Sequence, residues 1–196
     1  MESWISNLRP ALAATALLVV ATGVAYPLAV WGAASAWFPE RAGGSLVRKD
    51  GRVVGSRLLA QAFAESTMFQ PRPSAAGAGY DGKSSSGSNA GPLNKVYVGT
   101  VVPNRVAAYI AVNALPSGTP VPGSAVSASG SGLDPDITLD DALLQAPRVA
   151  RARGLDPAAV ERLVRSRVHS AWWHAEPLRP VNVLELNLAL ESAHAR

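Results

Sequence analysis

The chain contains no cysteine among its 196 residues. This absence excludes a disulfide-stabilised scaffold, thiolate zinc sites, iron–sulfur clusters and a cysteine nucleophile. Charged residues are also scarce, at 16% of the chain against about 25% in an average soluble protein. The formal net charge is +4, which is far short of the dense basic tracts that indicate a nucleic-acid partner. We therefore expect no nucleic acid among the partners.

What is abundant is apolar and turn-forming sequence. Apolar residues make up 48% of the chain, enough to build a hydrophobic core, so a wholly disordered protein is excluded. The length suits one domain, on a prior of roughly 150 residues for each domain. The 17 glycines and 15 prolines predict that a good part of the chain forms turns and loops.

An uncharged segment lies near the N-terminus, between Pro10 and Pro39. About 20 apolar residues cross the hydrocarbon core of a bilayer, so this segment predicts a membrane helix. Pro27 interrupts the helix, which is tolerable in a membrane when neighbouring helices satisfy the freed backbone groups. A cleaved signal peptide is the alternative, because Ala34-Ser35-Ala36 fits the cleavage pattern, but the segment is about twice the usual signal length. We predict an N-terminal segment 1–9, a retained transmembrane helix 10–38 and a soluble domain 39–196.

The charges that flank this helix leave its orientation open. Before it, Arg9 and the amino terminus are positive, and five basic residues follow it: Arg41, Arg48, Lys49, Arg52 and Arg57. A literal count of positive charges places the large domain in the cytoplasm. That rule is weak when a long folded domain follows a single span, because long segments translocate largely regardless of charge.

The first half of the soluble domain is rich in turn signals. Residues 46–54 predict two short strands joined by an Asp50-Gly51 turn, because this dipeptide accepts the positive φ of a tight hairpin. Ser56 is then predicted to cap a helix that carries Leu58, Leu59, Ala62 and Phe63 on one face. A long Gly/Ser/Pro-rich loop follows over residues 71–92, with its Gly/Ser-rich part at 74–92. Residues 94–113 could be helical, with Pro103 breaking or kinking the helix.

The last third has clearer helix signals. A short extended piece is expected over residues 126–131. Thr138 or Asp140 should cap a helix that runs through Arg153 and ends at Gly154. Asp156 should cap the next helix, and residues 182–193 form a final amphipathic helix. The arginines of these helices are expected on a solvated surface: Arg148, Arg151, Arg153, Arg162, Arg165 and Arg167.

One segment matches a phosphate-binding motif by its letters alone. Residues 77–84 satisfy the P-loop pattern G-x-x-x-x-G-K-[ST], with Lys83 as its lysine. A working P-loop lies between a buried strand and a helix, whose N-terminal N–H groups hold the phosphates. The flanks here are rich in proline and serine and fit neither element. We therefore interpret the match as accidental.

Other signatures of enzyme or metal chemistry are weak. His169 and His174 are five residues apart, a poor spacing for two metal ligands on one helix face, and they are expected to pack at a helix end. Asp134 and Asp136 flank a proline and fit a turn better than a hydrolytic carboxylate pair. The G-x-S-x-G element of a serine hydrolase is missing from the sequence. We expect no catalytic residue and no metal site.

A series of short motifs follows the N-terminal span in a characteristic order. The motifs are Gly55-Ser56-x-Leu58-Leu59-x-Gln61-x-Phe63, Phe69-x-x-Arg72-Pro73-Ser74, Tyr80-Asp81, Ser86-Gly87-Ser88-Asn89, Ser127-Ala128-Ser129-Gly130-Ser131-Gly132-Leu133-Asp134-Pro135, Gln145-x-x-Arg148-Val149-Ala150-x-Ala152-Arg153 and Val181-Asn182-Val183-Leu184-x-Leu186-Asn187. In this order the chain resembles the C subunit of the bacterial Kdp potassium-transporting ATPase over nearly its whole length.

The resemblance implies an α/β (α+β) soluble domain behind a single N-terminal transmembrane helix. It also implies an accessory, non-catalytic subunit of an ATP-driven, high-affinity potassium import complex in the bacterial inner membrane. The sequence agrees, because it contains neither the D-K-T-G-T motif of the pump subunit nor the T-V-G-Y-G filter of a potassium channel. The implied partners are a channel-like potassium-binding subunit, a P-type pump subunit, a small accessory membrane subunit and the lipid bilayer.

Two properties attributed to the family are in tension. Its C subunit is described as a catalytic chaperone that raises the ATP affinity of the pump subunit. Its soluble domain is placed outside the cytoplasm, with the N-terminus inside, whereas ATP is inside the cell. We favour assembly and stabilisation of the complex as the role. A membrane-anchored periplasmic binding module without a transport role is the alternative.

Two sets of candidate site residues follow from these motifs. The first could contact a nucleotide: Ser129, Gly130, Ser131, Gly132 and Gln145. The second set comprises residues of the family motifs, which are expected to contact partner subunits: Phe69, Arg72, Pro73, Ser74, Tyr80, Asp81, Ser88, Asn89, Leu133, Asp134, Pro135 and Arg148. No tightly bound cofactor is expected, and ATP is retained as a candidate ligand of the first set.

Overall fold

The computed structural model of the chain describes residues 2–169 and 178–194. Two compact units divide the chain, residues 1–46 and residues 47–196, and each is considered by itself. The expectation that His174 packs at a helix end, with Trp172 and Trp173 beside it, lies outside the described residues.

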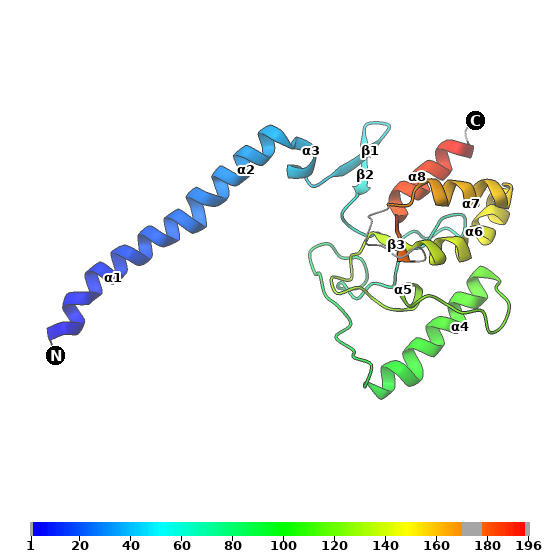
Figure 1. Cartoon of the computed structure of the whole chain (residues 1–196), viewed down its shortest axis with the longest axis horizontal. Helices are drawn as coiled ribbons and strands as arrows, with labels where there is room; N and C mark the ends of the chain where they lie inside the picture. Colours follow the sequence, from blue (N-terminus) through cyan, green and yellow to red (C-terminus); the bar gives the residue numbers. More distant parts are fainter. Residues whose placement is uncertain (1, 170–177, 195–196) are drawn as a thin grey trace. The chain divides into compact units, whose positions relative to one another are not determined.

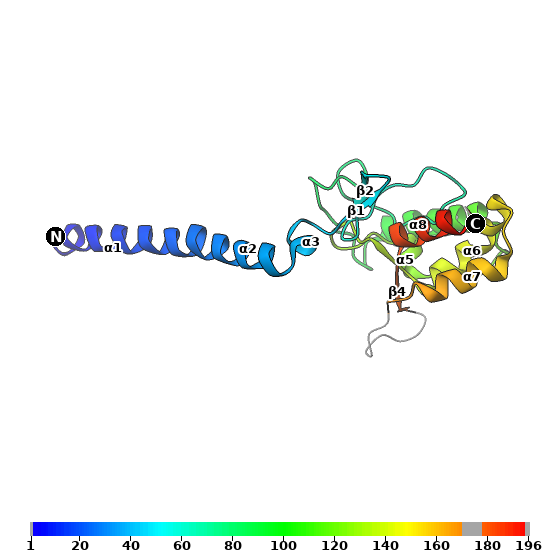
Figure 2. The same ribbon diagram turned by 90° about the horizontal axis from the view of Figure 1, so that it is seen from above.

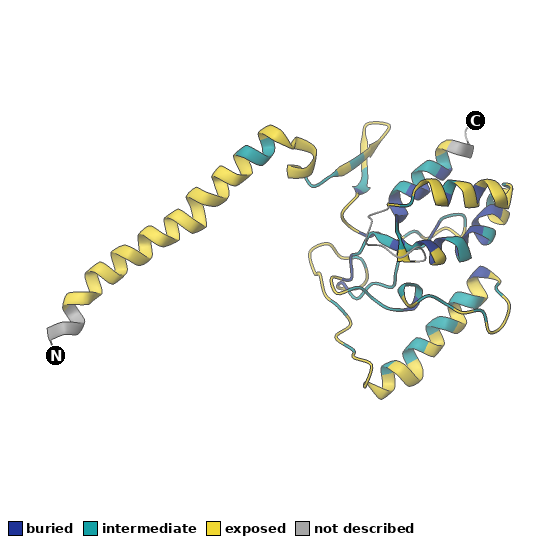
Figure 3. Ribbon diagram, in the orientation of Figure 1, coloured by how far each residue is buried: buried dark blue, intermediate teal, exposed yellow. Residues whose placement is uncertain are grey.

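The first unit is a long apolar helix. It consists of α1 (Glu2–Val20), a π-helical turn (Ala21–Ala25) and α2 (Tyr26–Trp37), and the short helix α3 (Pro39–Ala42) follows. Over residues 6–37 it is long and apolar enough to cross a membrane, and none of its most hydrophobic window is buried in the chain (Figure 3). The predicted single span is thus matched by one helix. Its predicted boundaries at residues 9/10 and 38/39 stay predictions.

Pro27 and Pro103 have the same local arrangement. The π turn Ala21–Ala25 ends two residues before Pro27, and a second π turn, Tyr97–Val101, ends two residues before Pro103. Proline cannot donate a backbone hydrogen bond, and its ring crowds the carbonyl four residues earlier. Widening the preceding turn relieves that crowding and lets the helix continue. The predicted break at Pro103 is therefore a π turn that leads into α4 (Val102–Asn113).

The second unit begins with the predicted hairpin. Strands β1 (Leu46–Lys49) and β2 (Arg52–Ser56) pair with each other, and Asp50 and Gly51 have φ values of 51° and 77° at the turn. The helix predicted after Ser56 is wrong. The Ser56 hydroxyl instead accepts the Leu58 N–H at 3.1 Å in a turn, and the chain then runs without regular structure to residue 94. The segment after Ser56 does not become helical because its contacts with distant parts of the domain, described below, override its local helix propensity.

The three helices predicted in the last third are confirmed. Thr138 caps α6 (Leu139–Arg153) by accepting the Asp141 N–H at 3.4 Å, and Gly154 ends the helix with a φ of 65°. Asp156 caps α7 (Pro157–Ser166), and α8 (Val183–His194) closes the domain. Short helix α5 (Gly123–Val126) precedes them, so the expected extended piece begins only at Ser127.

A small sheet that the sequence did not predict joins distant segments. Strand β3 (Asp136–Thr138) pairs antiparallel with β4 (Pro180–Asn182), with Ile137 opposite Val181. Each strand has three residues, too few for an alternating pattern to be recognised. Because the strands are antiparallel, α6 begins at one end of the sheet, beside Arg179, and α8 begins at the other end, beside Pro135.

The core lies where α6, α7 and α8 pack together (Figures 1 and 2). Its most buried side chains come from these helices, from the β3–β4 sheet and from Phe69, which is 0% exposed. Helix α4 contacts α6 but belongs to the edge of the domain, and its N-terminal end points away from the other helices (Figure 1). The soluble domain is thus α+β, as predicted.

Candidate functional site

An ion pair of Arg72 and a hydrogen bond of Ser74 connect two of the motif segments. The Arg72 Nη1 lies 2.8 Å from the Asp134 Oδ2, and this ion pair is only partly exposed. The Ser74 hydroxyl donates to the Gly132 carbonyl at 2.7 Å. These bonds join the F-x-x-R-P-S segment to the S-A-S-G-S-G-L-D-P segment, although about sixty residues separate them.

Ser74 also organises the loop that follows it. Its oxygen accepts the N–H groups of Ala76 at 3.1 Å and Tyr80 at 2.8 Å. The Tyr80 hydroxyl donates back to the Arg72 carbonyl at 2.8 Å. Burial raises the pKa of Tyr80, so its hydroxyl stays a donor at neutral pH. Asp81 is exposed and caps the next turn by accepting the Lys83 N–H at 2.9 Å.

Gly132 is where the two loops come closest. It has a φ of 67°, and a Cβ atom there would overlap the Ser86 carbonyl and lie 2.8 Å from the Ala76 nitrogen. The neighbouring Ser131 carbonyl accepts the Ser86 N–H at 3.0 Å. The glycine is therefore required both for backbone conformation and for close approach.

The remaining motif residues of these loops differ in burial. Ser88 and Asn89 are exposed, and Asn89 has a φ of 53°. Leu133 is buried, and its carbonyl accepts the Ala60 N–H at 2.9 Å. The Pro135 carbonyl accepts the N–H of Val183, at the start of α8. Ser88 and Asn89 are thus free to meet a partner, whereas Leu133 and Pro135 hold the domain together.

Side-chain amides hold the backbone of Phe69 and Gln70. Asn187 of α8 accepts the Phe69 N–H at 2.8 Å and donates to the Phe69 carbonyl at 3.0 Å. Gln145 of α6 accepts the Gln70 N–H at 2.8 Å and donates to the Gln70 carbonyl at 3.0 Å. Each amide supplies the donor and acceptor that a neighbouring strand would supply. Gln145, predicted as a candidate nucleotide contact, thus holds the backbone of Gln70 with its amide.

Arg148 corrects a prediction, because it is buried rather than solvated. It is 6% exposed, and its guanidinium donates to the Asn113 Oδ1 at 2.9 Å, the Met68 carbonyl at 3.0 Å, the Gln145 Oε1 at 3.0 Å and the Ser66 carbonyl. Burial lowers the pKa of Arg148, but its ordinary value is so high that it stays charged. The other arginines of that predicted set are exposed except Arg153, which is half-buried and donates to the Thr67 carbonyl.

A buried carboxylate completes this network. Asp141 is 1% exposed, and its Oδ1 accepts the Tyr109 hydroxyl at 2.7 Å and the Gln145 Nε2 at 2.9 Å. Burial raises the pKa of Asp141, and the bonds from Gln145 and Tyr109 and the charge of Arg148 oppose that rise. Burial and the neighbouring carboxylate likewise raise the pKa of Tyr109.

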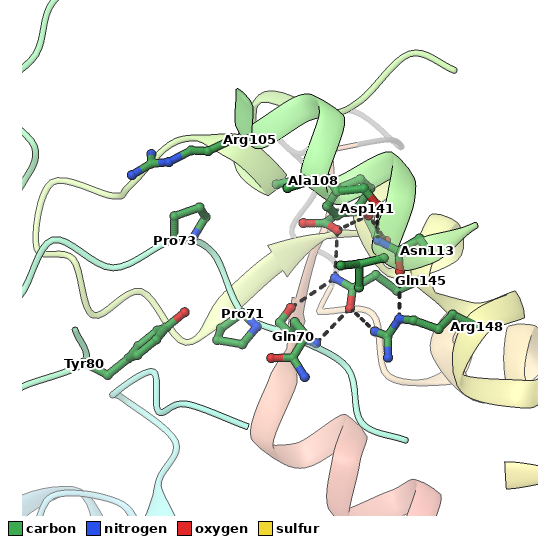
Figure 4. A pocket seen from close by; sticks show the side chains of 13 residues that line it. Gln70, Pro71, Pro73, Tyr80, Arg105, Ala108, Asn113, Asp141, Gln145 and Arg148 are labelled. Carbon is green, nitrogen blue, oxygen red and sulfur yellow. Dashed lines mark hydrogen bonds between the residues drawn. The ribbon is translucent and has the colours of Figure 1, made fainter. Parts of the chain in front are cut away.

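The network forms the floor of a pocket beside α4 (Figure 4). Its volume is about 280 Å³. Apolar groups form much of its wall, from Pro71, Pro73, Tyr80, Ala108 and Val112, and the polar groups of Asp141, Gln145, Asn113 and Arg148 lie at its base. A pocket with apolar walls and few convergent polar groups is typical of a binding site.

The structure separates the members of the nucleotide-binding set. Gln145 lines the pocket, and Ser129, Gly130, Ser131 and Gly132 do not. The N–H groups of Gly132, Leu133 and Asp134 already donate to the backbone or hydroxyl oxygens of Ser129 and Ser131, at 3.1 to 3.4 Å. These donors are thus engaged within their own loop. Nucleotide binding by this set stays a prediction.

The accidental P-loop match lies in irregular structure. Residues 77–84 are turns, with neither a strand before them nor a helix directly after them. In the described part of the chain, no group of three or more His, Asp or Glu side chains could hold a metal ion. His169 lies 3.4 Å from the Glu185 carboxylate in a partly exposed pair.

Sequence reasoning missed Tyr109, Asn113, Asp141 and Asn187 as site residues. Asn187 was within a quoted motif, so its segment was found but its role was not. Tyr109 and Asp141 carried no signal at short range, because 32 residues separate them and only the packing of α4 on α6 brings them together.

Comparison with known proteins gives consistent results over nearly the whole chain. A family described as "KdpC: K+-transporting ATPase, c chain" matches residues 8–192. A potassium-transporting ATPase KdpC subunit of Mycobacterium tuberculosis (strain H37Rv) is 47% identical over 185 residues, which cover 94% of this chain and 97% of the relative. The KdpC subunit of Caulobacter vibrioides (strain NA1000) is 48% identical over 191 residues, covering 97% and 95%.

Proposed function

The chain belongs to the KdpC family of potassium-transporting ATPase subunits, and from this membership we propose that it assembles and stabilises its complex without catalysing a reaction itself. Membership makes it a subunit of a P-type ATPase complex with a role in potassium transport. The proposal concerns the finer role, the side of the membrane and the partners.

The proposal is supported by the hydrogen-bond partners of the motif side chains. Arg72, Ser74 and Gln145 all bond to other parts of the same domain. Side chains used in this way determine the shape of the domain, and a reactive group would need to be free for a substrate. Among the described residues, Asp141 has the only buried carboxylate of the pocket, and it has no histidine, serine or second carboxylate bonded to it as a catalytic partner.

The apolar helix supplies the proposed assembly surface in the membrane. Its side chains are exposed along residues 6–37, apart from the half-buried residues 33–35, and are therefore available to lipid and to helices of other subunits. We propose the channel-like potassium-binding subunit, the P-type pump subunit and a small accessory membrane subunit as its neighbours in the bacterial inner membrane. The soluble domain would lie outside the cytoplasm and cap the channel-like subunit.

The second candidate role is that of a chaperone that raises the ATP affinity of the pump subunit. It would place the domain on the same side as ATP, or would require an effect transmitted through the membrane helices. The proposed periplasmic domain excludes direct contact with cytoplasmic ATP. The side of the membrane therefore discriminates between assembly from outside and direct nucleotide binding by the set that includes Gln145.

Topology can be tested directly because the chain lacks cysteine. We would introduce Ala158→Cys, an exposed position on α7, and as a matched control Glu2→Cys, which precedes residues 6–37. Intact cells would be treated with a membrane-impermeant maleimide. Labelling of the first variant and protection of the second is expected. The reverse pattern would contradict the periplasmic placement and favour direct nucleotide contact.

Assembly can be tested by removing residues 1–37. The truncated chain should fail to co-purify with the other subunits and should not restore potassium uptake. Full uptake with the truncated chain would contradict the assembly role. Failure of the full-length chain to co-purify with any larger membrane subunit would instead favour a separate, anchored periplasmic binding module.

A further inference from the structure

The pocket beside α4 has an unused polar atom at its base. Asp141 uses Oδ1 for both of its side-chain hydrogen bonds, from Tyr109 and from Gln145. Among residues 2–169 and 178–194, no donor bonds to Oδ2, although the residue is only 1% exposed. Figure 4 shows this second oxygen on the side of the pocket that faces Pro73. Oδ2 is not among the fully buried side-chain atoms that lack a partner in the described residues, so it is reached from the pocket. An occupant that displaces water there would be favoured if it donates a hydrogen bond to this oxygen.

The charges around the pocket restrict the kind of donor. Arg105 and Arg148 both line it, so two guanidinium groups accompany the one carboxylate. The Arg105 Nη1 donates to the Val126 carbonyl at 2.9 Å, which keeps this cation beside the pocket. An incoming ammonium or guanidinium group would meet like charges. A neutral N–H or O–H donor satisfies Asp141 without that repulsion.

The walls restrict the body of the occupant. Pro71, Pro73, Tyr80 and Val112 present flat or branched apolar surfaces, and Val112 is 62% exposed although it is large and hydrophobic. The volume of about 280 Å³ suits one large side chain and is too small for a folded segment. An aromatic ring with a polar edge fits both the walls and the base.

We propose that this pocket receives one aromatic side chain that carries a hydrogen-bond donor, tryptophan or tyrosine, from another subunit of the potassium-transporting complex. Its N–H or O–H donates to the Asp141 Oδ2, and its ring packs on Pro71, Pro73 and Val112. Such anchors account for most of the binding energy in many interfaces. The inference rests on the proposed assembly function and names the contact through which the soluble domain takes part in it.

The first test fills the pocket. Ala108 and Ala107 are adjacent, exposed alanines of α4, and only Ala108 lines the pocket. Full-length Ala108→Trp should reduce co-purification with the other subunits at least tenfold, whereas Ala107→Trp should leave it unchanged. Asp141→Asn, which keeps the shape but replaces the free acceptor with a donor, should reduce it about tenfold. Thermal unfolding of each variant in detergent establishes that it is folded.

The second test uses a defined probe on the full-length chain in detergent. N-acetyl-tryptophanamide should bind, as measured by saturation-transfer NMR, and its 1-methyl derivative should bind about tenfold more weakly because it has lost the indole N–H. Asp141→Asn should abolish that difference, and Ala108→Trp should abolish binding.

The outcomes separate the pocket from the proposed function. If the wild-type chain does not co-purify with other subunits, the assembly function itself is wrong. If the wild-type chain and folded Ala108→Trp co-purify equally well, assembly stands and the anchor pocket is overturned. Preferential binding of a nucleotide, an amine or a lipid headgroup, lost in Asp141→Asn without any effect on assembly, would overturn the aromatic assignment as well.

Discussion

The side-chain amide of Gln145 binds both backbone groups of Gln70, accepting its N–H at 2.8 Å and donating to its carbonyl at 3.0 Å. The side-chain amide of Asn187 binds both backbone groups of Phe69, the residue before Gln70, in the same way. An irregular segment is thereby fixed between α6 and α8 without belonging to a sheet. This arrangement explains why a stretch with few secondary-structure signals contributes the fully buried Phe69 to the core.

Loss of the Gln145 amide should be strongly destabilising. Gln145→Ala leaves the Gln70 N–H and carbonyl without partners and removes an acceptor of Arg148, so we expect a loss of about 3 kcal/mol in the free energy of unfolding. Denaturant unfolding in detergent measures it. Glu161→Ala, on the exposed face of α7, is the control and should change stability by less than about 0.5 kcal/mol. Equal effects would contradict the role of the amide.

The two amides should act as one unit. Once either amide is removed, the segment around Phe69 and Gln70 is free to detach, so the second loss should cost less. We expect Gln145→Ala with Asn187→Ala to destabilise the chain by at least about 1 kcal/mol less than the sum of the single variants. Strict additivity in the same measurement would show that the two contacts form independently.

Gly132 should tolerate no side chain. Gly132→Ala combines a positive φ with overlap against the Ser86 carbonyl, so a loss of about 3 kcal/mol is expected. Gly118→Ala is the matched control, because Gly118 has a φ of 83° and open space around it, and should cost about 1 kcal/mol. Similar losses for the two variants would mean that backbone conformation alone, and not the approach of the loops, requires glycine.

The Arg72–Asp134 ion pair should contribute more than a surface pair. A double-mutant cycle to alanine should give a coupling energy of about 1 kcal/mol, because the side chains are only 23% and 32% exposed. The Arg162–Asp156 pair lies 3.7 Å apart with exposures of 71% and 61%, and its coupling should be close to zero. Raising the salt concentration should weaken the second pair further. A coupling near zero for both pairs would contradict this prediction.

Asp141 should make stability depend on pH in a defined direction. Its pKa is raised above the ordinary 3.8, chiefly by burial, so the folded chain binds this proton more tightly than the unfolded chain. The resulting stabilisation is complete below the unfolded value and is lost as pH rises through the folded pKa. Asp141→Asn lacks this pH-dependent stabilisation. As pH rises from 3.8, the melting temperature of the wild-type chain should therefore fall relative to that of the variant. A difference that is constant with pH would contradict the raised pKa.

Signals confined to a few neighbouring residues predicted their elements well. Asp50-Gly51 specified the hairpin, Thr138 and Asp156 specified helix starts, and Gly154 specified a helix end, because caps and turns depend on side chains within three or four residues. Ser56 carried a similar signal and failed. Its hydroxyl does accept a nearby N–H, but Gln61 bonds back to the Val54 carbonyl and Ala60 to Leu133, and these contacts replace the helix.

The candidate site was predictable only in part as a set of residues, and not as an arrangement. Of the residues selected from motifs, Gln145 and Arg148 belong to the network under the pocket, and Arg72 and Ser74 instead join two loops through Asp134 and Gly132. Tyr109, Asn113 and Asp141 of the network were not selected. Arg148 was placed on the surface because an arginine on a helix is usually solvated. Its burial depends on carbonyls of Ser66 and Met68, about eighty residues earlier, which no local pattern reveals.

The sequence by itself determined the apolar helix, the hairpin, the three C-terminal helices and the family, since each depends on composition, local spacing or motif order. Tertiary structure alone decided the pairing of β3 with β4, the amide bonds to Phe69 and Gln70, and the pocket over Asp141. The physical reason is distance along the chain. Gln145 and Gln70 are 75 residues apart, and their bond forms only when the packing of the whole domain has offset the entropy of closing so long a loop.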